Sequence, residues 1–160
     1  MGGIGIRSDR RPGDDALIVD LHRRGYAHEG PRFGESFCAF VGETLAEGGL
    51  DDPARGRVWF AEQDGETVGC AALVNRGERG QIRWVVLLPE ARGSGLGKAL
   101  VQLALDHSAA QGHRSVFLET TDGLDASKTL YEKFGFATVV EEMAPLWHGR
   151  GTYIVMERHL

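Results

Sequence analysis

Hydrophobic residues follow two different periods along the chain, and the change of period separates predicted helices from predicted strands. Apolar side chains spaced three or four residues apart indicate helices with one buried face. Short alternating or continuous apolar runs bounded by turn residues indicate strands. The helical segments are 14–25, 33–48, 96–112 and 124–134. The strand segments are 3–7, 58–63, 67–74, 81–88, 115–119, 136–142 and 151–158. This order predicts a mixed sheet with helices on both faces.

The strand predicted over 81–88 has the most informative pattern. Its first half alternates between polar and apolar residues, with Gln81 on the polar side. Its second half, 85–88, is apolar throughout, which predicts a strand end buried on both faces.

Composition narrows the class of protein. Residues 1–160 are expected to form a single domain, because this length suits one hydrophobic core and no linker divides it. Apolar residues make up 42% and charged residues 26% of the chain, which excludes a disordered charged protein. A net charge of −5 makes nucleic acid a poor candidate partner. Glycine is the exception, with 23 of 160 residues, roughly twice the ~7% average.

The sequence predicts no disulfide, no metal site and no membrane-spanning segment. Cys38 and Cys70 stand among apolar residues, which is typical of buried free thiols in a reducing compartment. No Cys/His spacing suits a metal site, so no metal is expected. The first residues lack the apolar core of a signal peptide, and no apolar run approaches 18 residues. We therefore expect a cytoplasmic protein without a membrane partner.

The most informative glycines are Gly93, Gly95 and Gly97, between a predicted strand and a predicted helix. Closely spaced glycines let backbone N–H groups approach a ligand, and unpaired N–H groups at a helix start favour an anion. A phosphate or pyrophosphate is the expected ligand. The P-loop motif fails because Ala99 stands where its Ser or Thr belongs, and the dinucleotide motif fails because Lys98 replaces its last glycine.

The segment around these glycines resembles the acetyl-CoA motif of the GNAT N-acetyltransferases. The apolar run 85–88 is followed by Arg92, Gly95 and Gly97, which match the family pattern Gln/Arg-x-x-Gly-x-Gly/Ala. Residues 130–136 match a second family signature, Leu-Tyr-x-x-x-Gly-Phe. The order of elements also matches over nearly the whole chain. A finer likeness, to the acetyltransferase half of bacterial MarR–acetyltransferase fusion proteins, rests on 11–14, 122–124 and 147–149.

The resemblance implies an α/β (α+β) fold: a mixed, mostly antiparallel twisted sheet of six or seven strands with about four helices. It also implies an acetyl-CoA-dependent N-acetyltransferase that moves an acetyl group to a primary amine by direct attack in a ternary complex. The alternative is a non-catalytic acyl-CoA-binding or regulatory module of the same fold. The family allows a homodimer, and the sequence does not identify the amine.

The resemblance assigns the cofactor site to three segments. The backbone after the buried strand would hold the pyrophosphate, the strand itself would align the pantetheine, and the N–H of Leu87 would polarise the thioester carbonyl. Many family members carry Asn where this chain has Leu124, so a neighbour such as Ser127 would supply that contact. The expected cofactor-binding residues are Val85, Val86, Leu87, Arg92, Gly93, Ser94, Gly95, Leu96, Gly97, Lys98 and Ser127.

Two residues are catalytic candidates. Tyr131 matches the family's general acid, although a tyrosine on an apolar helix face can also be a plain core residue. Glu119 ends a strand where some family members place a general base, and the alternative is a merely solvated carboxylate. The segments 26–35 and 143–150 are expected to line the acceptor pocket. Their polar and aromatic candidates for substrate binding are Tyr26, His28, Glu29, Trp147 and His148.

Overall fold

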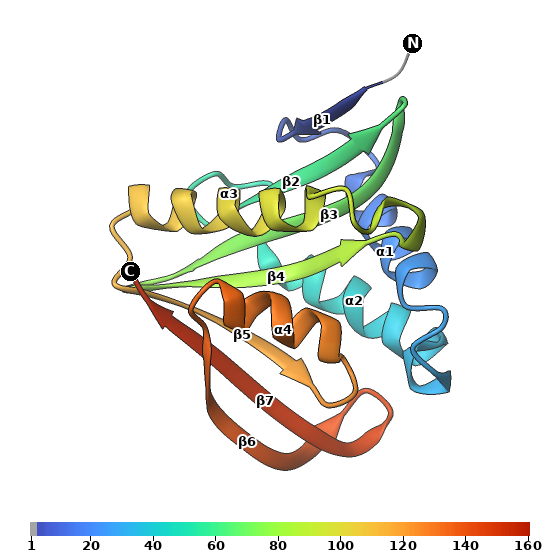
Figure 1. Ribbon diagram of the computed structural model, residues 1–160, viewed down its shortest axis with the longest axis vertical. Coiled ribbons are helices and arrows are strands. Elements are labelled where there is room, and N and C mark those ends of the chain that lie inside the picture. The colour runs from blue at the N-terminus through green and yellow to red at the C-terminus, as the bar shows by residue number, and fades with distance from the viewer. Residues whose placement is uncertain (1–2) are drawn as a thin grey trace.

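The computed structural model describes residues 3–160, which form one sheet flanked by helices (Figure 1). Its strands are β1 (Ile4–Arg7), β2 (Gly56–Gln63), β3 (Glu66–Arg76), β4 (Arg79–Leu87), β5 (Ser115–Thr121), β6 (Ala137–Leu146) and β7 (Gly149–His159). Its α-helices are α1 (Asp14–Gly25), α2 (Glu35–Gly48), α3 (Leu96–Ala110) and α4 (Asp125–Lys133). Within the described residues, the predicted order of elements and the α+β class are confirmed.

The sheet is mixed and mostly antiparallel. Its strand order is β1-β2-β3-β4-β5-β7-β6, and β4 and β5 form the parallel pair. Figure 1 shows α1 and α2 behind the sheet and α3 and α4 in front of it. The buried hydrophobic residues of all four helices and of the central strands join in one core.

Local sequence signals explain several turns. Asp64 and Gly65 join β2 to β3, and both have positive φ angles, 53° and 82°, as a tight two-residue hairpin requires. Gly49 ends α2 with a φ of 68°, the left-handed conformation that glycine adopts at low cost. These glycines act as turn and cap residues.

The feature that shapes the site is the separation of β4 from β5. The two strands pair only where each begins, from Arg79 opposite Ser115 to Gln81 opposite Phe117. Beyond Gln81 they diverge, so the rest of β4 has a strand partner only on the β3 side. The sheet is therefore split between two central strands, a position where backbone polar groups can meet a ligand.

The structure corrects the expected burial of β4. The residues at its end were expected to be buried on both faces, but Val85 and Leu87 are half-buried, while Val86 and Leu88 are buried. The split from β5 is the physical reason, because it leaves Val85 and Leu87 beside cavities. Gln81, expected on the polar side, is only 2% exposed.

The C-terminal hairpin is longer than the sequence pattern indicated. Strands β6 and β7 pair as far as Leu146 opposite Gly149. The segment 143–150, which lies between the two predicted strands, is therefore mostly strand, with Trp147 and His148 at a tight turn. This turn carries Trp147 back toward α2, where it contacts Phe40.

Candidate active site

A bulge in β4 marks the start of the split. The register with β3 shifts between Cys70 and Ala72, so β4 has one residue more than its partner there. Trp84 has a φ of 50°, which is unusual for a bulky side chain. Its indole Nε1 donates to Thr44 Oγ1 at 3.1 Å and so anchors the bulge on α2. Bulges of this kind redirect a strand and commonly occur beside active sites.

Beyond the bulge, alternation along the strand directs backbone groups into the split. The N–H of Leu88 donates to Val68 O of β3 at 2.8 Å. The N–H of Leu87, one residue earlier, therefore points toward the β5 side. Val85 follows the same alternation, since its carbonyl accepts the Tyr26 hydroxyl at 3.3 Å. The end of β4 thus offers an unpaired edge.

The first of two cavities lies between this edge and α4, with a volume of about 410 Å³. Its walls come from β4, from the start of α3 and from the loop and helix that follow β5. A Cβ on Gly97 would stand 3.8 Å from Leu87 and 3.9 Å from Leu130, in ordinary van der Waals contact with both side chains. We call this first cavity the cofactor cavity.

The glycine turn borders the cofactor cavity through Arg92 and Gly97, while the other predicted cofactor residues of the turn, Gly93, Ser94, Gly95, Leu96 and Lys98, lie outside its lining. Gly93 and Gly95 have φ angles of 82° and 84°, and nothing lies within 4 Å of a Cβ placed on either. Within the described part of the chain, the backbone N–H groups of Gly93, Ser94, Gly95, Gly97 and Lys98 have no acceptor. Free N–H groups at a helix start are the arrangement that favours an anion.

The charged residues of this turn differ in position. Arg92 lines the cofactor cavity and donates to Gly25 O, the last residue of α1, at 3.2 Å. Lys98 is exposed on the first turn of α3. The side chain of Leu96 is buried in the core, so only its backbone can take part in binding.

The second cavity, of about 530 Å³, lies on the side of the split that faces α1 and α2. We call it the acceptor cavity. One side of it is an aromatic wall, whose neighbouring ring centroids are 5.0–5.6 Å apart. The wall consists of Tyr26, Phe33, Phe37, Phe40 and Trp147.

Two interactions of Arg32 link the aromatic wall to the segment after β5. Trp147 Nε1 donates to the carbonyl of Arg32 at 2.6 Å. The Arg32 guanidinium pairs with Asp122, which follows β5, at 3.1 Å. Beneath the wall, His22 is buried, and its Nδ1 lies 2.8 Å from Ile18 O, so this nitrogen carries the proton. Burial lowers the pKa of His22 to about 4, so the ring is neutral.

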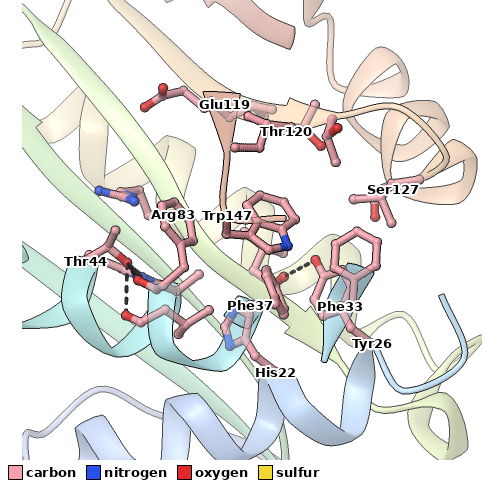
Figure 2. Close-up of a pocket in the computed structure, with 18 of the residues that line it drawn as sticks. His22, Tyr26, Phe33, Phe37, Thr44, Arg83, Glu119, Thr120, Ser127 and Trp147 are labelled. Atoms are coloured by element: carbon pink, nitrogen blue, oxygen red, sulfur yellow. Dashed lines mark hydrogen bonds between the residues drawn. The ribbon is translucent and has the colours of Figure 1, made fainter. Parts of the chain in front are cut away.

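The opposite end of the acceptor cavity is polar, as Figure 2 shows for Arg83 and Glu119. Gln81 Nε2 donates to Glu119 Oε1 at 2.7 Å, and the Tyr153 hydroxyl donates to Glu119 Oε2. Gln81 Oε1 accepts from Arg76 Nε at 2.9 Å, which fixes the amide orientation. Burial and the bond to Glu119 raise the pKa of Tyr153 to about 12. Glu119 is therefore oriented by two donors.

The two cavities meet. Five residues line both of them: Tyr26, Val85, Leu124, Ser127 and Tyr131. Tyr131 is buried, and burial raises its pKa, so its phenol is protonated. Among the described residues its hydroxyl has no hydrogen-bond partner, whereas the Tyr26 hydroxyl donates to Val85 O. Tyr131 thus has a free O–H donor where the cavities join.

The structure brings some predicted substrate residues together and leaves others apart. Tyr26 and Trp147 belong to the aromatic wall. Glu29 lines the cofactor cavity instead of the acceptor cavity. His28 is exposed and lines neither cavity. His148 packs edge-on against Trp147 and also lines neither cavity. The predicted roles of His28 and His148 therefore gain no support from their positions.

Several residues of the acceptor cavity escaped the sequence analysis. Phe33, Phe37 and Phe40 are read as a helical core stripe, and their spacing does not distinguish a core from a cavity wall. Gln81 and Arg83 look like the polar side of a strand. Only the split of the sheet reveals that these side chains face a cavity.

Residues 3–160 contain no group of three or more His, Cys, Asp or Glu side chains arranged to hold a metal ion. No helix in the same range is long and apolar enough to span a membrane.

Comparisons with known proteins agree with this geometry. The model of the acetyltransferase (GNAT) family matches residues 18–136. A mycothiol acetyltransferase from Streptomyces griseus is 35% identical over 145 residues, which cover 85% of this chain and 44% of that protein. The chain thus spans less than half the length of this relative. The relative is not a MarR fusion, so the finer likeness expected from the sequence gains no support from it.

Solved structures share the fold. An acetyltransferase of the GNAT family from Desulfovibrio desulfuricans has a TM-score of 0.76 and 19% identity, over 98% of this chain and 99% of that one. An acetyltransferase from Salmonella typhimurium, solved with its cofactor acetyl-CoA, has a TM-score of 0.70 and 18% identity, over 99% of this chain and 94% of that one. Identities this low establish the fold alone.

Proposed function

Since this chain belongs to the GNAT acetyltransferase family, we propose that it transfers the acetyl group of acetyl-CoA to a primary amine by direct attack in a ternary complex. The observation that carries the proposal is that the cofactor cavity and the acceptor cavity meet at Tyr131. Two substrates that enter from opposite sides of the split would meet beside this hydroxyl. A pure binding module has no need for such a second cavity.

The residues of the cofactor cavity fit acetyl-CoA, which supplies the thioester acetyl group. The free N–H groups between Gly93 and Lys98 would bind the pyrophosphate, with Arg92 as a charged neighbour. The unpaired edge of β4 would hold the pantetheine as an extra strand, and the N–H of Leu87 would polarise the thioester carbonyl. Ser127, on α4 and in both cavities, would take the place of the family's Asn.

Glu119 is proposed as the base for the amine. A lysine-like amine has a pKa near 10.4, so at pH 7 about one molecule in 2,500 is neutral, a cost of roughly 4.6 kcal/mol. Glu119 lies at the polar end of the acceptor cavity, and Gln81 and Tyr153 orient its carboxylate. A positioned base of this kind, acting directly or through one water, offsets part of that cost.

Tyr131 is proposed as the general acid. Its raised pKa keeps the phenol protonated, and its O–H is free to donate. The leaving group is a thiolate, whose conjugate thiol has a pKa near 8.5, so a nearby donor assists its departure without a strong acid. Tyr26 is the second phenol at the junction, but its proton is engaged by Val85 O.

The experiment combines binding and turnover. Acetyl-CoA at 100 times its Kd should stabilise the protein by about 2.7 kcal/mol and raise Tm by about 5–10 °C. Purified protein with acetyl-CoA and a broad amine panel should then release free thiol, followed with a thiol dye. The absence of a thermal shift would remove the cofactor assignment. A shift without thiol release on any amine would contradict the enzyme and leave the binding module.

A further inference from the structure

The guanidinium of Arg83 is the one charge of the acceptor cavity for which the described residues provide no partner. Arg83 lies on β4, is half-buried and lines the cavity. No described acceptor lies within hydrogen-bond distance of it, and no carboxylate lies within 4 Å. Burial lowers its pKa, which reflects the cost of keeping this cation away from water. A half-buried cation of this kind calls for an anion from outside the chain.

The surrounding residues explain why Arg83 stays free. Glu119 and Glu47 act on it electrostatically, and Arg76 opposes them. Glu119 cannot turn toward it easily, because its two oxygens accept from Gln81 and Tyr153. The guanidinium lies over the Trp84 ring, with Cζ 4.6 Å from the ring centroid. Stacking of this kind holds a guanidinium fork ready for a carboxylate.

We propose that the acceptor is an α-amino acid with an aromatic side chain, bound as a zwitterion. Arg83 binds the carboxylate, Glu119 binds the ammonium group, and the aromatic wall contacts the side chain. The proposal rests on the proposed function, because it names the amine that the acceptor cavity receives. Figure 2 shows the arrangement, with Arg83 and Glu119 toward one end and Phe33 and Tyr26 toward the other.

The charges select this class over others. One guanidinium beside one carboxylate suits a ligand with one negative and one positive group, whereas a dianionic phosphate would be repelled by Glu119. A polyamine has no group for Arg83 and would place further cations beside it. The wall supplies aromatic surface for an apolar side chain, for which edge-on and offset ring contacts are favourable.

The test compares three acceptors that differ only at the carboxylate: L-phenylalanine, L-phenylalaninamide and 2-phenylethylamine. Thiol release should give a kcat/KM for phenylalanine at least 10-fold above the other two. In Arg83→Gln this preference should fall below about 2-fold, through KM, while the affinity for acetyl-CoA stays unchanged. Arg79→Gln is the matched control, because Arg79 lies on the same strand, outside both cavities, and should keep the preference.

A second measurement separates this proposal from the proposed function. N-acetyl-L-phenylalanine and its amide can be titrated by the fluorescence of Trp84 and Trp147, which line the cavity, without any turnover. The acid should bind at least 5-fold more tightly than the amide, and only in protein with Arg83. Equal binding of acid and amide, or equal turnover of the three amines, would overturn the carboxylate subsite. Selective binding without turnover on any amine would keep the subsite and overturn the transferase.

Discussion

The cofactor cavity and the acceptor cavity share five residues but are built in different ways. The groups proposed to bind the cofactor are mostly backbone N–H groups from the continuous segment 85–98, in and beside the cofactor cavity. The acceptor cavity is lined mainly by side chains from α1, α2, β4, β5, α4 and the β6–β7 hairpin. The cofactor cavity therefore depends on the spacing of glycines along the chain, and the acceptor cavity depends on how distant elements pack. Variants should accordingly separate cofactor affinity, acceptor affinity and chemistry.

The largest expected effect is a loss of kcat on substitution of Tyr131, where the two cavities meet. Tyr131→Phe should lower kcat by about 100-fold, since a positioned proton donor contributes 10²–10⁴-fold, while the Kd for acetyl-CoA changes less than about 2-fold. Thiol-release kinetics and calorimetric titration measure the two quantities. Tyr26→Phe removes a hydroxyl that is bound to Val85 O and should cost less than about 5-fold in kcat. Equal losses in both variants would refute the acid role of Tyr131.

The second prediction concerns the pH dependence of the protein's stability, which His22 beneath the aromatic wall should control. The folded-state pKa of His22, about 4, lies below its ordinary 6.5, so the unfolded chain binds this proton first. Stability is then lost as pH falls from about 6.5 toward 4, by about 2 kcal/mol between pH 7 and pH 5. Urea unfolding at both pH values should show this loss. His22→Asn, which can still donate to Ile18 O, should lack that share of the pH dependence.

Two glycines in the same backbone conformation allow an effect on acetyl-CoA affinity to be separated from an effect on stability. Gly95 and Gly112 flank α3, both have φ near +83°, and a Cβ on either would meet nothing within 4 Å. Gly95→Ala and Gly112→Ala should each cost about 1 kcal/mol of stability, measured by urea unfolding. Only Gly95→Ala should weaken acetyl-CoA, by about 10-fold, because it disturbs the free N–H groups. Equal acetyl-CoA affinities in the two variants would exclude an anion role for the turn.

The smallest effect concerns the aromatic wall. Trp147→Leu keeps an apolar side chain but loses the ring contacts to Phe37 and Phe40 and the bond to Arg32 O. Contacts of this kind are worth about 1 kcal/mol, so KM for the amine should rise about 5-fold. The Kd for acetyl-CoA, measured in parallel, should stay constant. A change in cofactor affinity alone would show that the wall serves the other cavity.

The sequence predicted the order of elements because each helix and strand has its own period and its own glycine or turn signal. It also indicated the glycine turn, since three glycines between a strand and a helix form a local pattern. It did not indicate that β4 and β5 separate after Gln81, because strand pairing is a long-range property. The half-burial of Val85 follows from that separation, whereas Gln81 is buried where the two strands still pair, so both exposures depend on long-range pairing.

The sequence by itself determined the elements, the glycine turn and the position of Tyr131 on an apolar helix face, because these depend on residues close together in the chain. The tertiary structure alone decided that Arg83, Glu119 and the aromatic wall share a cavity. It also decided that His28 and His148 lie outside that cavity. The physical reason is that a side-chain constellation drawn from separate elements exists only after those elements have packed around the split in the sheet.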